Sequence, residues 1–259
     1  GVGGIVLLPA LQLFIGAVGW REACIGMAIL VLVVIVPINA LLQRHRPEDL
    51  QLQPDGEQAG GASTSAVKRA AEIADPAFAA IEWTYRRIAR EPRFWALSGA
   101  LFCSLFVHYA VLVHQTKFFI EVGFGVTQSA WALGFVGLVG IPGQLFIGAL
   151  SDRIGREWGW ALAMSGYVIA FSLFLAMLEV GASPALLYAS ILAVGALGAG
   201  TGPLFGSIGA ELFGGRYYGR VFGLLGVATA LGAATGAWAT GWVYDITGGY
   251  ALGFKLGLV

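Results

Sequence analysis

The sequence predicts an all-α integral membrane protein, and its composition and its apolar runs are the observations that predict this class. Of the 259 residues, 58% are hydrophobic and 12% are charged, and the mean hydropathy is +0.78. A soluble domain carries about 25% charged residues. Apolar runs of about 20 residues alternate with short charged stretches, and a helix of that length crosses a bilayer core of roughly 30 Å. The net charge is zero, which gives no indication of nucleic acid as a partner.

Six apolar runs are long enough to cross a membrane, and each is predicted to form one transmembrane helix. They extend over about 22–42, 94–120, 127–150, 158–178, 185–205 and 221–244. A shorter apolar run stands at each end of the chain, and neither contains the roughly 20 residues that a span needs. We therefore expect an internal fragment of a longer protein, with a partial helix at each end.

The longest polar segment, residues 43–92, predicts a domain boundary between residues 1–42 and residues 93–259. Its first part is rich in Pro, Gly and Ser, as linkers are. In its second part Asp75-Pro76 is a helix-start signal. The apolar side of the helix expected to follow consists of Phe78, Ile81, Tyr85 and Ile88. This helix is either an ordinary solvated linker helix or one that lies in the headgroup region, with the arginines at its end near anionic lipid.

The basic residues predict the orientation of the spans. If the linker is cytoplasmic, alternation of the spans puts twelve of the 15 basic residues on the cytoplasmic side, which is the side that Lys and Arg favour. The twelve are Arg44, Arg46, Lys68, Arg69, Arg86, Arg87, Arg90, Arg93, Arg153, Arg156, Arg216 and Arg220. The sequence thus predicts a multi-pass protein of a plasma or bacterial inner membrane with a cytoplasmic central loop.

Polar side chains inside the span 94–120 are the first candidates for a solute or proton path. At about 100° per residue, Ser104, His108 and Gln115 fall within a sector of roughly 40°. The charged form of an ionisable group at that depth costs several kcal/mol unless it is compensated. His108 is therefore the leading candidate for contact with substrate or a proton, and the alternative is a neutral histidine that hydrogen-bonds a neighbouring helix. His114 lies on an adjacent face, either at the rim or in the cavity.

Small residues form faces on the later spans. Gln144 lies on a glycine face of the span 127–150. Such a face suits either tight packing, which is expected for the glycines, or the lining of a solute path, for which Gln144 is the candidate. Four glycines share a face of the span 185–205, in which Pro203 interrupts the backbone hydrogen bonds. The last full span carries a stripe of Thr229, Gly232, Gly236 and Thr240. Close-packed, bendable helices suit gating of one bundle against another, and they are also ordinary in static membrane proteins.

Charged residues in two cytoplasmic turns predict a network that holds one conformation. The first turn carries Asp152, Arg153 and Arg156, and the second carries Glu211, Arg216 and Arg220. Exposed ion pairs contribute about 0–1 kcal/mol each. Such a gate would therefore bias a conformational equilibrium and not lock it.

The first of these turns carries a family resemblance. Gly148-Ala149-Leu150-Ser151-Asp152-Arg153-Ile154-Gly155-Arg156 resembles the Gly-x-Leu-x-Asp-Arg-x-Gly-Arg signature of the major facilitator superfamily, in the version found between its eighth and ninth helices. The resemblance implies a twelve-helix fold of two bundles, covered here from a truncated fifth helix to a truncated twelfth. Residues 1–42 would end the amino-terminal bundle, residues 43–92 would be the central loop, and residues 93–259 would form the carboxy-terminal six-helix bundle.

Shorter stretches are similar to the monocarboxylate and oxalate/formate branch of that superfamily. They are Gly19-Trp20-Arg21, Arg46-Pro47-Glu48-Asp49-Leu50, Phe94-Trp95, Val113-His114 and Tyr244-Asp245-Ile246-Thr247-Gly248. One feature departs from the branch, whose members often carry an acid and an arginine in the eighth helix. Residues 127–150 contain no charged residue, so a carboxylate substrate would need its cation elsewhere.

The resemblance implies a secondary active transporter of a small solute, such as the organic anion of a monocarboxylic acid, that works by alternating access. The alternative is a membrane sensor or scaffold that binds ligand without moving it. An enzyme is not expected, because the sequence contains no His-Glu-x-x-His, Gly-x-Ser-x-Gly or phosphate-cradling loop. No cofactor or metal is predicted. The expected partners are the solute, a coupling ion, the lipid bilayer and the amino-terminal bundle of the same protein.

Overall fold

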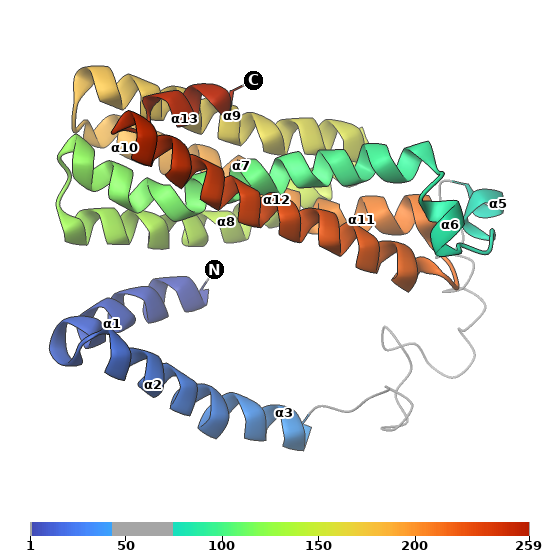
Figure 1. The fold of residues 1–259 in the computed structure, drawn as a ribbon, viewed down its shortest axis with the longest axis horizontal. Helices are drawn as coiled ribbons and strands as arrows, with labels where there is room; N and C mark the ends of the chain where they lie inside the picture. Colours follow the sequence, from blue (N-terminus) through green and yellow to red (C-terminus); the bar gives the residue numbers. More distant parts are fainter. Residues whose placement is uncertain (1, 43–74, 259) are drawn as a thin grey trace.

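The computed structural model describes residues 2–42 and 75–258, and in these residues all regular secondary structure is helical. Six helical rods in the described part are long and apolar enough to cross a membrane. They coincide with the six predicted spans; the first begins two residues before its predicted start, and the other five extend beyond both predicted ends. The predicted all-α membrane fold is therefore confirmed. Figure 1 shows a bundle of long helices with a separate helical hairpin beside it.

The hairpin consists of two antiparallel rods. The first is α1 (Val2–Val18), and the second is built from α2 (Trp20–Leu30), the π-helical turn η1 (Val31–Ile35) and α3 (Val36–Leu42). Pro37 follows the π-helical turn, and proline lacks an amide hydrogen and crowds the carbonyl four residues earlier. A wider turn accommodates both effects. Of the bundle helices, α8 packs against α1.

The bundle begins with three uninterrupted helices and continues with a broken span. The helices are α7 (Pro92–Val122), α8 (Val126–Ile154) and α9 (Arg156–Val180). The broken span consists of α10 (Pro184–Leu192), the π-helical segment η4 (Ala193–Leu197), the 3-10 turn η5 (Gly198–Gly200) and α11 (Thr201–Phe213). The chain ends with α12 (Tyr218–Thr247) and the short α13 (Ala251–Leu256).

The two prolines within the bundle spans have different effects. Pro203 follows the break at η4 and η5, and the carbonyl that its ring would crowd belongs to Ala199. The predicted interruption of this span is therefore confirmed, one to two turns before the proline. Pro142 lies inside α8, which is α-helical from Val126 to Ile154 without interruption.

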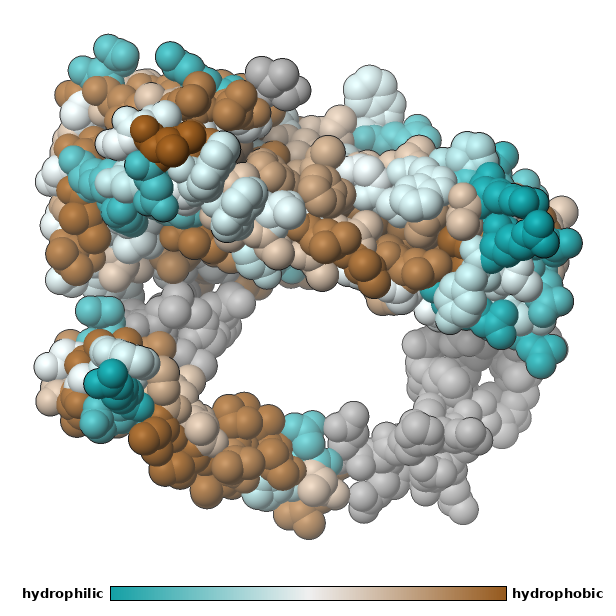
Figure 2. Space-filling view, viewed as in Figure 1, coloured by the Kyte–Doolittle hydropathy of each residue, from teal (hydrophilic) through white to brown (hydrophobic). Residues whose placement is uncertain are grey.

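The helices of the bundle have two distinct ends. The linker end is defined by Pro92, the turn 152–156 and the turn 214–217, and the far end by the turns 123–125, 181–183 and 248–250. Hydrophilic residues gather at the linker end, at the right of Figure 2, while apolar side chains cover much of the surface between the ends. This is the pattern of a protein whose middle is surrounded by hydrocarbon.

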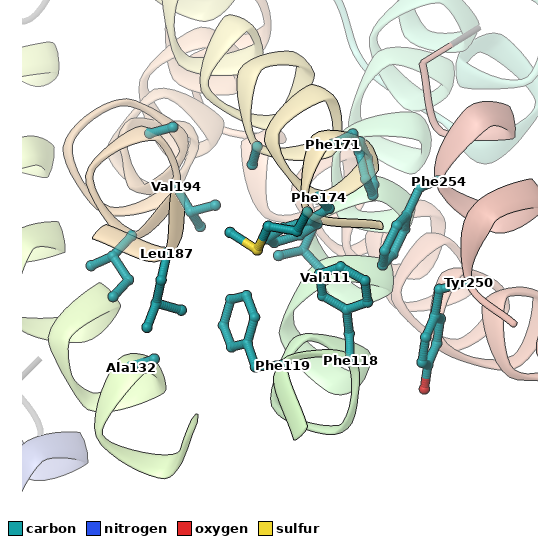
Figure 3. Packing of buried hydrophobic residues seen from close by; sticks show 14 of the residues in the cluster. Val111, Phe118, Phe119, Ala132, Phe171, Phe174, Leu187, Val194, Tyr250 and Phe254 are labelled. Carbon is teal, nitrogen blue, oxygen red and sulfur yellow. The ribbon is translucent and has the colours of Figure 1, made fainter. Parts of the chain in front are cut away.

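An aromatic cluster fills the bundle toward its far end (Figure 3). Phe118 and Phe119 of α7 pack on Phe174 of α9, with ring centroids 5.2 and 5.6 Å apart. Phe254 of α13 closes the cluster at 5.0 Å from Phe118. All four rings are at most 1% exposed, so they fix the positions of α7, α9 and α13.

The closest helix contact joins α7 and α12 through glycine. A Cβ atom at Gly236 would overlap the carbonyl oxygen of Phe106 and would lie 2.7 Å from its carbonyl carbon. A Cβ atom at Gly232 would overlap the carbonyl oxygen of Phe102 in the same way. The two glycines of the predicted stripe on α12 thus form a packing face toward α7.

The helix expected after Asp75-Pro76 is two short helices, and the prediction of a single helix was wrong. The Asp75 carboxylate accepts a hydrogen bond from the amide of Phe78 at 3.0 Å, as the start signal predicts, but α5 (Pro76–Ala79) ends at once. Thr84 caps α6 (Tyr85–Ile88). The expected linker features before residue 75 lie outside the described residues.

These two helices pack on the bundle instead of presenting one apolar side to solvent or lipid. Ile88 and Trp83 are buried in a cluster with Phe213 of α11, and Phe78 and Ile81 border it. Tyr85, which was expected on the same side, is 66% exposed. We call residues 75–91 the linker cap.

Candidate functional site

A cavity of about 680 Å³ lies among four helical rods at the middle of the bundle. Its lining comes from α7, α8, the broken span and α12, and the polar side chains in it are His108, Gln144, Thr201 and Thr229. The structure thus brings together His108 and Gln144, two of the predicted path residues from different spans. Among the described lining residues, His108 is the one ionisable side chain.

His108 is oriented by a hydrogen bond across the bundle. Its Nδ1 lies 2.6 Å from the hydroxyl oxygen of Tyr167 on α9, and the two rings meet edge to face at 5.9 Å. The Tyr167 hydroxyl donates to the carbonyl oxygen of Gly198 at 3.2 Å. Because Nδ1 is engaged, Nε2 is the ring nitrogen left for a cavity occupant. His108 therefore lines the cavity and also bridges to a neighbouring helix, while its contact with substrate or a proton stays a prediction.

Tyr167 was not predicted as a site residue. It is 1% exposed, and a buried tyrosine hydroxyl usually finds a hydrogen-bond partner. A tyrosine inside the span 158–178 was the available signal, but nothing in the sequence connects it with a histidine 59 residues earlier.

The remaining predicted path residues on α7 lie outside the cavity lining. Ser104 is buried and donates to the carbonyl of Ala100 in its own helix at 2.8 Å. Gln115 is 2% exposed and packs in the interior. Although the 40° sector contains all three positions, only His108 of the three lines the cavity. As path candidates, Ser104 and Gln115 are not supported by the geometry.

His114 serves to join helices. Its Nε2 lies 2.9 Å from the carbonyl oxygen of Ala237 on α12, and its Nδ1 lies 3.3 Å from the hydroxyl of Tyr250. His114 is not among the residues that line the cavity, and its predicted place at the rim or in a path stays a prediction.

A second polar cluster, the Arg156 network, lies at the linker end. The Arg156 guanidinium is 2.5 Å from the Asp152 carboxylate and donates through Nε to the Glu211 carboxylate at 2.7 Å. Its Nη1 also donates to the hydroxyl of Ser151 at 2.7 Å. Gly155 allows this geometry because its φ of 96° reverses the chain between α8 and α9. Arg156 thus ties the end of α8 and the start of α9 to α11.

Three residues of the two predicted turns are not in the network: Arg153, Arg220 and Arg216, whose guanidinium lies 5.9 Å from the Tyr217 ring. Arg153 is exposed, and within the described residues it forms no ion pair. Arg220 points to the linker cap, where Nη1 donates to the carbonyl oxygen of Trp83 at 3.4 Å, and its guanidinium lies 5.2 Å from the Tyr217 ring. Asp152, Arg156 and Glu211 form the network, beside a cavity of about 820 Å³.

Comparison with known proteins agrees with this architecture. The family model of the Major Facilitator Superfamily matches residues 1–237. No curated protein matches the chain. The family match covers the hairpin, the cavity and the Arg156 network. The chain therefore belongs to the major facilitator superfamily, a family of membrane transporters.

Proposed function

We propose that this protein is a secondary active transporter that moves a small solute by alternating access, with the His108 cavity as one wall of the solute path. The observation that carries this is the position of the cavity. It lies at mid-depth among α7, α8, the broken span and α12, where transporters of repeated-bundle architecture bind their solutes. In this proposal an amino-terminal bundle of the same protein supplies the opposite wall.

The solute class follows from the chemistry of the lining. The lining is mostly apolar, and its polar side chains are one imidazole, one amide and two hydroxyls. A protonated His108 can pair with the single carboxylate of a solute. A solute with several charges would find no second ionisable side chain among the described lining residues. We infer a small organic anion of the monocarboxylate type, taken up with a proton as coupling ion. The similarity of short stretches to the monocarboxylate and oxalate/formate branch supports the same class.

The orientation proposed for the transporter has the linker end in the cytoplasm. Of the described basic residues, eight lie at that end: Arg86, Arg87, Arg90, Arg93, Arg153, Arg156, Arg216 and Arg220. Basic residues near span ends favour the cytoplasmic side. The Arg156 network would then act on the cytoplasmic side of the path, in a plasma or bacterial inner membrane.

Uptake by the full-length protein in liposomes tests this function. We expect saturable uptake of at least one of labelled lactate, pyruvate, formate and oxalate, stimulated by an inward proton gradient. His108→Gln should lower the initial rate about tenfold or more, because a hydrogen bond to a charged group contributes about 1.5–3 kcal/mol. His114→Gln is the matched control, since His114 lies on the same helix but bonds to Ala237 outside the cavity.

Absence of flux for any of a broad set of small solutes would contradict the transporter proposal. Equal losses in the two glutamine variants would contradict the role given to the His108 cavity.

A further inference from the structure

Tyr167 joins the cavity histidine to the break in the spanning helix. On one side its hydroxyl oxygen lies 2.6 Å from His108 Nδ1 at the cavity wall. On the other side it donates to the carbonyl oxygen of Gly198 at 3.2 Å. Gly198 begins the 3-10 turn η5, directly after the π-helical segment η4. One buried hydroxyl therefore touches both the cavity histidine and the break in the spanning helix.

The backbone around Gly198 is held closely by its neighbours. A Cβ atom at Gly198 would lie 2.9 Å from the Tyr167 ring, and one at Gly166 of α9 would lie 2.6 Å from the Gly198 amide nitrogen. The Gly198 carbonyl also accepts a hydrogen bond from the Thr201 hydroxyl at 3.0 Å. The backbone amide of Thr201 also donates to this carbonyl. Tyr167 therefore supplies one of two side-chain donors beside one backbone donor.

The Tyr167 hydroxyl has one proton and two acceptors within reach. When Nδ1 of His108 carries a proton, Nδ1 donates to the hydroxyl oxygen, and the hydroxyl donates to Gly198. When Nδ1 is unprotonated, the hydroxyl can turn to Nδ1, and the Gly198 carbonyl keeps the bonds from the hydroxyl and the backbone amide of Thr201. No proton leaves tyrosine in this exchange, because only the torsion of its C–O–H group changes.

We propose that Tyr167 is a positioning residue that couples the protonation and ligand state of His108 to the backbone at Gly198. This rests on the proposed function, since it takes the cavity as the solute path. A doubly protonated His108, or an occupant that donates to Nε2, holds the Gly198 bond in place. An occupant that accepts a hydrogen bond from Nε2–H of neutral His108 releases it. The solute in the cavity thereby changes the restraint on the broken span.

Among the described side chains around the cavity, His108 is the one whose charge changes near neutral pH, as the groups that face it show. On its own helix the Tyr109 ring lies 5.3 Å away, and from α9 it meets Tyr167. From α8, α11 and α12 the described cavity lining contributes the neutral Gln144, Thr201 and Thr229.

Backbone hydrogen exchange of the full-length protein in lipid nanodiscs tests the coupling without any solute. The measured quantity is the exchange rate of the amides of residues 193–202, corrected for intrinsic exchange. It is measured at about pH 5 and at about pH 8, which lie on either side of the ordinary pKa of histidine. At about pH 8 neutral His108 samples the tautomer with unprotonated Nδ1, which the doubly protonated ring at about pH 5 excludes. We therefore expect the wild-type rate to rise about two- to tenfold between these values, as for loss of one hydrogen bond. His108→Gln and Tyr167→Phe should each abolish the pH response.

Tyr218→Phe is the matched control. Its hydroxyl also donates to a glycine carbonyl of the same span, Gly206, at 3.3 Å, but it does not contact His108. This variant should keep the pH response of residues 193–202. A pH response that persists in Tyr167→Phe or in His108→Gln, or that is absent from the wild-type protein, would overturn the coupling. Either result is independent of the uptake assay, so failure of the coupling and failure of transport are distinguishable.

Discussion

Gly236→Ala is expected to destabilise the folded bundle by about 1–3 kcal/mol, the usual cost of inserting a methyl group into a well-packed interior. The added Cβ would overlap the carbonyl oxygen of Phe106 and would lie 2.7 Å from the carbonyl carbon and the Cα of that residue. The obstacle is backbone of α7, which cannot rotate away as a side chain can. Separation of α7 from α12 would also disturb the cavity, whose walls include both helices.

The matched control is Gly226→Ala on the same helix, where an added Cβ would meet nothing within 4 Å. Alanine exceeds glycine in helix propensity by up to about 1 kcal/mol, so this variant should be neutral or slightly stabilising. Thermal unfolding midpoints of the purified proteins in detergent measure both effects. Equal midpoints for the two variants would show that the α7–α12 contact is not as close as described.

Arg156→Ala is expected to lower the transport rate about tenfold or more, while the amount of folded protein changes little. Three hydrogen-bonded or ion-paired contacts, to Asp152, Glu211 and Ser151, depend on this guanidinium. Hydrogen bonds to charged groups contribute about 1.5–3 kcal/mol each, and their loss shifts the balance between conformations. Initial uptake rates per folded molecule provide the measurement.

Two further substitutions in the same turn give the comparison. Arg153→Ala should leave transport unchanged, because Arg153 is exposed and forms no ion pair within the described residues. Asp152→Asn should have a smaller effect than Arg156→Ala, because the Asp152 side chain is 61% exposed and exposed pairs contribute about 0–1 kcal/mol. If Arg153→Ala and Arg156→Ala behaved alike, the network would not be the element that sets the rate.

The spans could be predicted because a bilayer imposes length and hydropathy on each helix separately. Their ends could not, since polar residues such as Arg156 and Glu211 continue helices beyond the apolar run. The linker cap was missed for a different reason. A 3.6-residue period placed Tyr85 with Ile88, but burial of Trp83 against Phe213 requires a bend between two short helices, and tertiary packing overrides local periodicity.

The candidate site was predictable only in part. His108 and Gln144 stand out as polar residues at mid-span, which the membrane makes costly. Whether a polar side chain faces a cavity or a neighbouring helix depends on tertiary contacts, and these separate His108 from His114 although both lie on α7. The same limit applies to Arg153 and Arg156, because the turn at Gly155 decides which guanidinium reaches Glu211.

Two-sided access to the cavity is the most direct test of the transporter proposal. Thr229 lines the cavity, and a Thr229→Cys variant is made after the two exposed cysteines, Cys24 and Cys103, are replaced by alanine. Membrane-impermeant maleimide is applied to right-side-out and to inside-out vesicles. Val168→Cys is the control. Val168 is exposed on the outer surface of the spanning helix α9 and lies outside the cavity lining. Hydrocarbon surrounds that surface in the membrane, so this cysteine should stay unlabelled. Alternating access predicts labelling of Thr229→Cys from both sides, with a ratio that shifts when transported solute is added. Labelling from one side only, unchanged by any solute, would contradict transport through this cavity and would favour a sensor or scaffold.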